Sequence, residues 1–75
     1  GEWDRAARSA DRVLRLSPRQ PEALRDRGLA YLKLDHVGGA REDLGRYLQL
    51  HPEADDAAAL RETLIELNAL RPRSH

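Results

Sequence analysis

The sequence predicts an all-α protein, built as a short solenoid of four antiparallel helices. The first indication is an internal repeat: the motif Leu-x-Leu-x-Pro occurs at Leu14–Pro18 and again at Leu48–Pro52, a shift of 34 residues. Repeats of this length are typical of stacked two-helix units that cannot bury their apolar faces alone. The second indication is that apolar residues recur at intervals of three and four, as on one face of a helix. We therefore expect helices that pack on their neighbours along the chain.

Size and composition restrict the chain to one small domain. Of its 75 residues 35% are charged, and the net charge is zero. Residues 1–33 hold 8 Lys/Arg against 5 Asp/Glu and residues 34–75 hold 5 against 8, an asymmetry too small to indicate a nucleic-acid or membrane binder. The sequence has no cysteine, which excludes disulfides and thiolate chemistry and suits the cytoplasm. No apolar run approaches the roughly 18 residues of a membrane span.

The first two helices are predicted from their apolar stripes and from proline. The first ends near Ser17, because Pro18 disfavours helical geometry in the residue before it. The second begins at Pro21, which suits a first helical turn, has Glu22 near its positive end, and runs to about Leu34. The first stripe comprises Trp3, Ala6, Ala7, Ala10, Val13 and Leu14, and the second Leu24, Gly28, Tyr31 and Leu32.

The last two helices follow short connections, which force neighbouring helices to run antiparallel. The third begins after Asp35-His36 and ends at Pro52. The fourth is predicted to open with the acids Glu53, Asp55 and Asp56, which the helix dipole favours there, and to end at Pro72. The third stripe comprises Val37, Ala40, Leu44, Tyr47 and Leu48, and the fourth Ala57, Leu60, Leu64, Leu67 and Leu70.

Small and large residues recur at fixed positions within the repeat. Counting Pro21 as position one, Leu24 stands at the fourth, Gly28 at the eighth, Tyr31 at the eleventh and Ala40 at the twentieth. This pattern resembles the tetratricopeptide repeat (TPR), which implies a right-handed stack of about two repeats. The positions that carry the resemblance are Trp3, Ala6, Leu14, Pro18, Leu24, Gly28, Tyr31, Ala40, Leu44, Leu48 and Pro52.

The TPR register divides the chain into four parts. Residues 1–20 match the second half of a repeat whose first helix we expect before Gly1, and residues 21–54 form one complete repeat. Residues 55–71 match a capping helix, and residues 72–75 form a tail. In the capping helix Ala58 and Ile65 stand at the large positions and Glu62 replaces glycine.

Two residues of the complete repeat depart from the TPR pattern. Arg27 replaces the usual leucine at the seventh position, and Tyr47 replaces the usual alanine at the twenty-seventh. We expect the helices to cross there more loosely or at a different angle.

A narrower resemblance rests on residues 21–31 and 43–52. These runs are similar to the C-terminal tail of bacterial transglutaminase-like proteins of the SirB family. In that family a papain-like domain precedes the repeats, so the resemblance implies an upstream enzyme-like domain. The Cys, His and Asp of such a domain correspond to no residue of this chain.

Residue types that carry chemistry are present but scattered. His36, His51 and His75 do not share a helical face, so the sequence predicts no metal site. Ser9, Ser17 and Ser74 lack a neighbouring base, so we expect no catalytic residue and no cofactor. One face of the first helix carries five arginines, a pattern that could follow a phosphate backbone. However, we expect ion pairs Asp4–Arg8 and Asp11–Arg15 on this helix, which favour a solvated surface over a nucleic-acid binding site. The arginines are Arg5, Arg8, Arg12, Arg15 and Arg19.

By analogy with TPR proteins, the first helix of each unit lines a concave groove. The chaperone-tail carboxylate clamp is absent, because Leu29 stands at the ninth position. Leu29 and Leu32 are apolar where a solvated groove is polar, so either a partner covers them or the fourth helix does. Trp3 likewise is either a core residue covered in a longer protein or an exposed anchor. The groove candidates are Glu22, Arg25, Asp26, Leu29, Leu32, Lys33, Leu60, Thr63 and Leu67.

These observations predict a non-catalytic protein–protein interaction module. Its partner is expected to be a peptide or a protein domain, including an upstream domain of the same polypeptide. Two alternatives remain open: a homo-oligomerisation module, and an accessory part of an upstream transglutaminase-like enzyme.

Overall fold

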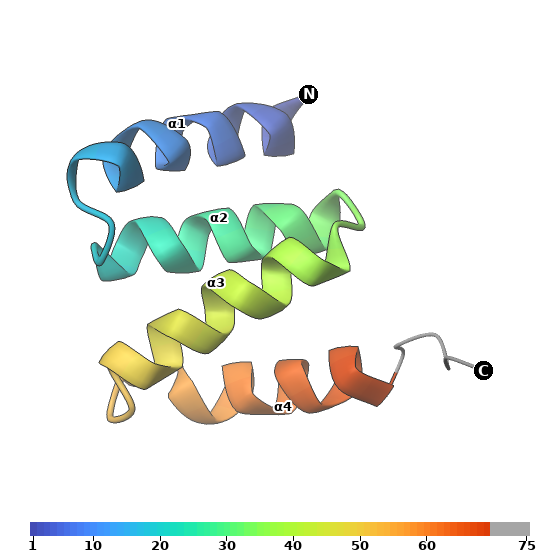
Figure 1. Ribbon diagram of the computed structural model, residues 1–75. Helices are drawn as coiled ribbons and strands as arrows, with labels where there is room; N and C mark the ends of the chain where they lie inside the picture. The colour runs from blue at the N-terminus through green and yellow to red at the C-terminus, as the bar shows by residue number, and fades with distance from the viewer. Residues whose placement is uncertain (70–75) are drawn as a thin grey trace.

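The computed structural model describes residues 1–69, and within them the chain forms four helices and no strand. The helices are α1 (Glu2–Leu16), α2 (Pro21–Lys33), α3 (Val37–Leu50) and α4 (Ala57–Ala69). Each helix runs antiparallel to the one before it, and the four helices are stacked in sequence order (Figure 1). The predicted all-α stack of four helices is confirmed. Expectations for Leu70, Pro72, Ser74, His75 and the tail lie outside the described residues.

The 34-residue repeat is visible in the backbone at the ends of α1 and α3. Ser17 has φ −137° and its N–H donates to the Val13 carbonyl at 2.8 Å, while His51 has φ −136° and donates to the Tyr47 carbonyl, also at 2.8 Å. Both residues precede a proline, which favours this extended geometry. The two Leu-x-Leu-x-Pro motifs therefore end their helices in the same way.

The start of α4 departs from both the repeat and our prediction. Glu53, Asp55 and Asp56 were expected inside its first turn, but α4 begins at Ala57 and its first turn contains no acid. The equivalent helix α2 begins with Pro21, whose fixed φ suits a first turn, whereas position 55 is an aspartate without that restriction. The chain instead makes one more turn, in which the Ala57 N–H donates to the Ala54 carbonyl at 3.0 Å.

The core is tightest where α2 crosses α3. Leu24 is 2% exposed, and Leu44 and Ala40 are fully buried. A Cβ atom on Gly28 would lie 2.8 Å from the side chain of Leu44, closer than real contacts allow. The missing side chain of glycine therefore allows the two helices to approach each other.

Arg27, one of the two departures from the TPR pattern, connects three helices. Its Nε donates to Asp43 Oδ2 at 2.6 Å, its Nη2 to Asp43 Oδ1 at 2.8 Å, and its Nη1 to Asp11 Oδ1 at 2.8 Å. Hydrogen bonding to Asp43 raises the pKa of Arg27 above its usual value. The sequence had suggested an ion pair between Asp11 and Arg15, but Asp11 pairs with Arg27 instead. We call Arg27, Asp43 and Asp11 the Arg27 ion cluster.

Tyr47, the second departure, is only 5% exposed. Its hydroxyl donates to Asp56 Oδ1 at 2.8 Å, and the other oxygen of Asp56 lies 3.6 Å from Arg25 Nη1. The hydrogen bond to Asp56, with burial, raises the pKa of Tyr47. The crossing is not loosened at these positions, because both unusual side chains are held by polar partners while Leu44 stays fully buried; the expected change of crossing angle stays a prediction.

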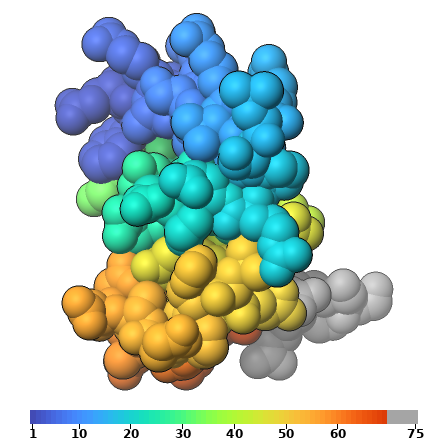
Figure 2. Space-filling model, turned by 90° about the vertical axis from the view of Figure 1, so that its left-hand side faces the viewer, coloured from blue at the N-terminus to red at the C-terminus, as the bar shows by residue number. Residues whose placement is uncertain are grey.

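The outer layers of the stack expose apolar residues that the sequence placed in a buried stripe or at large repeat positions. On α1, Ala7, Ala10 and Leu14 are buried, but Trp3 and Val13 are 40% and 42% exposed. On α4, Ile65 at a large repeat position is 67% exposed, and Ala58 is also exposed. Figure 2 views the edge of the stack and shows α1 as its uppermost layer. Among the described helices α1 packs on α2 alone and α4 on α3 alone, so each outer helix keeps one face open.

Candidate functional site

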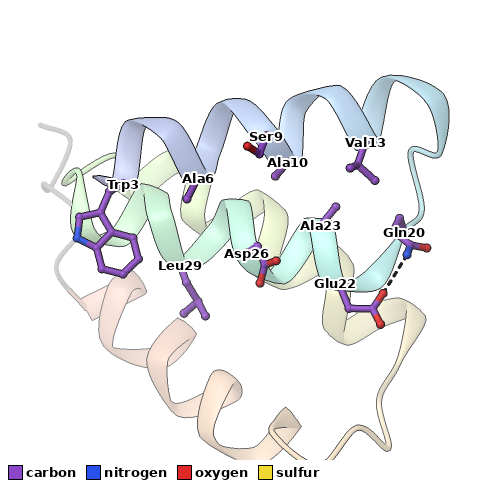
Figure 3. Close-up of a pocket in the computed structure, with 10 residues that line it drawn as sticks. All are labelled: Trp3, Ala6, Ser9, Ala10, Val13, Gln20, Glu22, Ala23, Asp26 and Leu29. Carbon is purple, nitrogen blue, oxygen red and sulfur yellow. Dashed lines mark hydrogen bonds between the residues drawn. The ribbon is translucent and has the colours of Figure 1, made fainter. Parts of the chain in front are cut away.

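An apolar groove of about 420 Å³ lies between α1 and α2 (Figure 3). We call it the α1/α2 groove. Its lining comprises Trp3, Ala6, Ser9, Ala10 and Val13 of α1, Gln20 before α2, and Glu22, Ala23, Asp26 and Leu29 of α2.

The shape of the groove follows from side-chain size along two helical stripes. Residues three or four apart lie on the same helical face, so the α1 residues of the groove form a single row. The alanines Ala6, Ala10 and Ala23 leave the space between the helices unfilled. Trp3, Val13 and Leu29 border this space and are 40%, 42% and 36% exposed. The result is a hollow with apolar walls that stays open to solvent.

The polar groups of the groove are mainly acidic. At one end Gln20 Nε2 donates to Glu22 Oε1 at 2.9 Å (Figure 3), and the Asp26 carboxylate lies 3.7 Å from Arg25 Nε. At the Trp3 end, Lys33 Nζ lies 5.7 Å from the centre of the indole ring, which is cation–π range. Within residues 1–69, no Lys or Arg forms a salt bridge with Glu22. An incoming cationic group would therefore find a carboxylate beside the apolar wall.

The structure brings three of the predicted groove residues together and disperses the others. Glu22, Asp26 and Leu29 line the α1/α2 groove. Leu60 and Leu67 are each 6% exposed, so their side chains serve packing and are not open for binding. The remaining residues have other partners: Arg25 contacts Asp56, Leu32 packs against the core, Lys33 lies over Trp3, and Thr63 donates to the Ala59 carbonyl.

The described residues bear on the alternatives left open for Leu29 and Trp3. The helix α4 packs on α3 and does not cover Leu29, which remains 36% exposed. Trp3 is exposed and borders the groove. Sequence reasoning had missed Ser9, Val13, Gln20 and the alanines as groove residues. The signal was available in the repeat, because Val13 aligns with Tyr47, which α2 buries on the equivalent face of α3.

A second hollow, of about 790 Å³, involves α1, α2 and α3 but is more polar. It contains the Arg27 ion cluster, whose carboxylates are already engaged by Arg27. Arg15 borders it, and all five arginines of the basic stripe are exposed. This surface matches the expected solvated face better than a binding site.

Residues 1–69 show neither a cluster of metal ligands nor a helix fit to span a membrane. In residues 1–69 no group of three or more His, Cys, Asp or Glu is placed to hold a metal ion. His36 instead stacks on Tyr31, with ring centres 5.7 Å apart, and His51 lies against Tyr47 at 5.9 Å. None of the helices between residues 1 and 69 combines the length and apolar character needed to span a membrane.

A stack of antiparallel helices with a 34-residue repeat and an open groove defines a helical-repeat protein. The tetratricopeptide repeat family model matches residues 1–64 of the chain. The chain therefore belongs to the tetratricopeptide repeat family, whose members generally mediate protein–protein interactions.

Two relatives from Xylella fastidiosa are similar to almost the whole chain. A UPF0162 protein of strain 9a5c is 59% identical over 73 residues, which are 97% of this chain and 26% of the relative. A UPF0162 protein of strain Temecula1 is 58% identical over 73 residues, with the same shares. The chain thus spans about a quarter of the length of these curated relatives. No solved structure matches the chain.

Proposed function

We propose that this chain is a non-catalytic interaction module that binds an apolar segment of a protein in the α1/α2 groove. One observation carries the proposal: Trp3, Val13 and Leu29 are exposed around a single hollow of about 420 Å³. Fully burying an exposed side chain of this size contributes roughly 1.5–3 kcal/mol, so covering the exposed 36–42% of these three contributes roughly 0.6–1.2 kcal/mol each and makes one apolar anchor. Tryptophan is also enriched among residues that dominate binding energies.

The chemistry of the lining supports binding without catalysis. The groove residues include no Cys, His, Lys or Arg. Ser9 is the one hydroxyl-bearing residue among them, and a serine nucleophile needs an adjacent base. The exposed carboxylates of Glu22 and Asp26 fit a role in selecting the charge of a ligand.

We further propose that the partner segment comes from the longer protein to which the module belongs, in the bacterial cytoplasm. The relatives are about four times as long as this chain, which leaves room for such a segment. The resemblance of residues 21–31 and 43–52 to the tails of transglutaminase-like proteins supports an enzyme-like upstream domain as its source.

A peptide-display selection against the chain tests the binding role. Selected peptides should lose at least tenfold in affinity on Val13→Asp, because that change puts a charge on the apolar wall. The control is Leu16→Asp, on the same helix but 88% exposed and outside the groove, which should leave affinity unchanged. Selection of no peptide that distinguishes these two variants would contradict the proposal.

Self-association through the same groove is the main alternative. It predicts a dimer whose population rises with concentration in sedimentation experiments and falls on Trp3→Ser. A monomer at all concentrations favours a partner segment. A role as an accessory part of an enzyme instead predicts that removing residues 1–75 from the longer protein lowers its turnover.

A further inference from the structure

Resting on the proposed function, we infer that the ligand of the α1/α2 groove is a single amphipathic α-helix, distinct from α1–α4. This ligand helix packs on α1 in the way that α2 packs on α3, and it directs a basic residue to Glu22. The inference uses the internal repeat of this chain as a template for a complex. Its steps concern shape, charge and side-chain volume.

The shape argument compares equivalent faces of α1 and α3. A shift of 34 residues places Ala6, Ala10 and Val13 on Ala40, Leu44 and Tyr47. On α3 this face is covered by α2, and the three residues are 0%, 0% and 5% exposed. On α1 the same face forms one wall of the groove, where Val13 is 42% exposed and Ala6 is half-buried, while Ala10 is already buried. The surface left open on α1 therefore has the geometry of one that a helix already covers on α3.

The charge argument follows from the contact between Arg25 and Asp56. Arg25 on α2 places Nη1 3.6 Å from Asp56, the residue just before α4. The residue 34 positions before Asp56 is Glu22, which lies in the groove. A helix that occupies the groove as α2 occupies its own site would thus bring the equivalent of Arg25 to Glu22. A lysine or arginine there would find an acidic partner beside Val13.

Side-chain volume gives a further property of the ligand. On α3, Leu44 comes so close to α2 that only glycine fits at position 28, with a Cβ distance of 2.8 Å. The α1 equivalent of Leu44 is Ala10, which is smaller. The ligand helix can therefore carry alanine or a larger residue where α2 carries Gly28.

A second copy of this chain fits the groove poorly. The helix that a second copy could offer is α4, whose open face includes Glu62 and Ile65. In the repeat register α4 carries Ala59 where α2 carries Arg25, so it offers no basic residue to Glu22. It would also bring Glu62 toward a groove that already contains Glu22 and Asp26. Like charges at close range oppose this pairing.

The probe for the test is a synthetic peptide with the sequence of residues 20–35, capped at both ends and carrying Gly28→Ala. This peptide contains no tryptophan, so the fluorescence of Trp3, the single tryptophan of the chain, reports its binding. We expect saturable binding that weakens at least tenfold on Val13→Asp in the chain. A peptide with Ala30→Pro, which cannot form the helix, should not bind.

A charge-reversal cycle tests the orientation of the helix. We expect Arg25→Glu in the peptide or Glu22→Arg in the chain to weaken binding at least fivefold, and the two together to restore most of the affinity. Glu66→Arg on α4 is the matched control in the chain and should have no effect, because Glu66 is exposed and outside the groove. Circular dichroism would confirm that each variant stays folded.

Several outcomes would overturn the inference. These are equal binding of the Ala30→Pro peptide, absence of binding by the helical peptide, and charge reversals without mutual rescue. If display-selected extended peptides still bind and lose affinity on Val13→Asp, the groove binds ligands but not in this way, and the proposed function stands. Concentration-dependent dimerisation that is lost on Ile65→Asp, on the open face of α4, would assign the groove to a second copy instead.

Discussion

Glycine at position 28 sets the distance between α2 and α3. A Cβ added there would meet Leu44 Cγ and Cδ2 at 2.8 Å and Asp43 Cβ at 3.3 Å. Leu44 is fully buried and Asp43 is held by Arg27, so neither has room to move away. Gly45 on α3 is also inside a helix, but a Cβ added there meets nothing within 4 Å. The two glycines therefore differ in packing and not in secondary structure.

We predict opposite effects of alanine at these two glycines. Gly28→Ala should lower the free energy of unfolding by about 1–2 kcal/mol, because overpacking outweighs the better helix propensity of alanine. Gly45→Ala should raise it by about 0.5–1 kcal/mol, since propensity acts alone there. Urea unfolding followed by circular dichroism measures both. Equal stabilisation by the two changes would show that α2 and α3 are not in close contact at Gly28.

At the scale of elements, the Arg27 ion cluster takes the place of an apolar contact between helices. Asp43 is 5% exposed and accepts two hydrogen bonds from Arg27, whose side chain is 25% exposed. A buried ion pair is often no better than a well-packed apolar pair, but removing one partner leaves an uncompensated charge. The cluster therefore makes the positions of α1, α2 and α3 depend on one another.

We predict that Arg27→Leu, which restores the usual TPR residue, destabilises this chain. The expected loss is about 2–4 kcal/mol, below the full cost of a deeply buried pair because Arg27 is partly exposed. Adding Asp43→Ala should recover at least half of the loss, since no buried carboxylate then remains. Asp11→Ala should cost less than about 1 kcal/mol, because the Asp11 side chain is 35% exposed. If the double variant Arg27→Leu/Asp43→Ala is no more stable than Arg27→Leu in urea unfolding, an uncompensated Asp43 charge is not the cause of the loss.

The stack as a whole has unequal layers. The inner helices α2 and α3 pack on neighbours at both faces, whereas among the described helices α1 contacts α2 alone and α4 contacts α3 alone. In repeat proteins stability is approximately a sum over units and their nearest-neighbour interfaces. The outer helices should therefore open more readily than the inner ones.

We predict this order in amide hydrogen exchange under native conditions. The backbone amides of α1 and α4 should exchange faster than those of α2 and α3, because local opening of an outer helix breaks only one interface. Addition of a groove-binding peptide should slow exchange in α1 and leave α4 unchanged. Uniform exchange rates across the four helices would indicate a single cooperative unit.

Much of this molecule could be predicted from its sequence, because local rules and the repeat agree. Prolines and helical periodicity placed α1, α2 and α3 within about two residues of their ends. The start of α4 could not be predicted in this way, since the acids at 53–56 suit a turn as well as a first helical turn. The Arg27 ion cluster was also missed, because its three residues come from three helices and meet only after packing.

The candidate groove was predicted only in part, for a physical reason. Periodicity assigned Trp3 and Val13 to a buried stripe, but burial depends on what covers a helical face. Within residues 1–69 no helix covers this face of α1. Residues such as Leu60 were placed in the groove by analogy with TPR proteins, whereas here they complete the core. Sequence reveals which residues are apolar, but the neighbouring layers decide which of them remain open.

Among the described helices, contacts occur only between helices that are consecutive in the sequence, which affects how the protein can fold during synthesis. Because every helix–helix interface within residues 1–69 joins neighbours in the sequence, each helix can dock as soon as the next one has left the ribosome. Synthesis from the N-terminus would complete the α1–α2 hairpin, and with it the ligand surface, before α4 exists. A nascent chain could therefore engage its partner while translation continues.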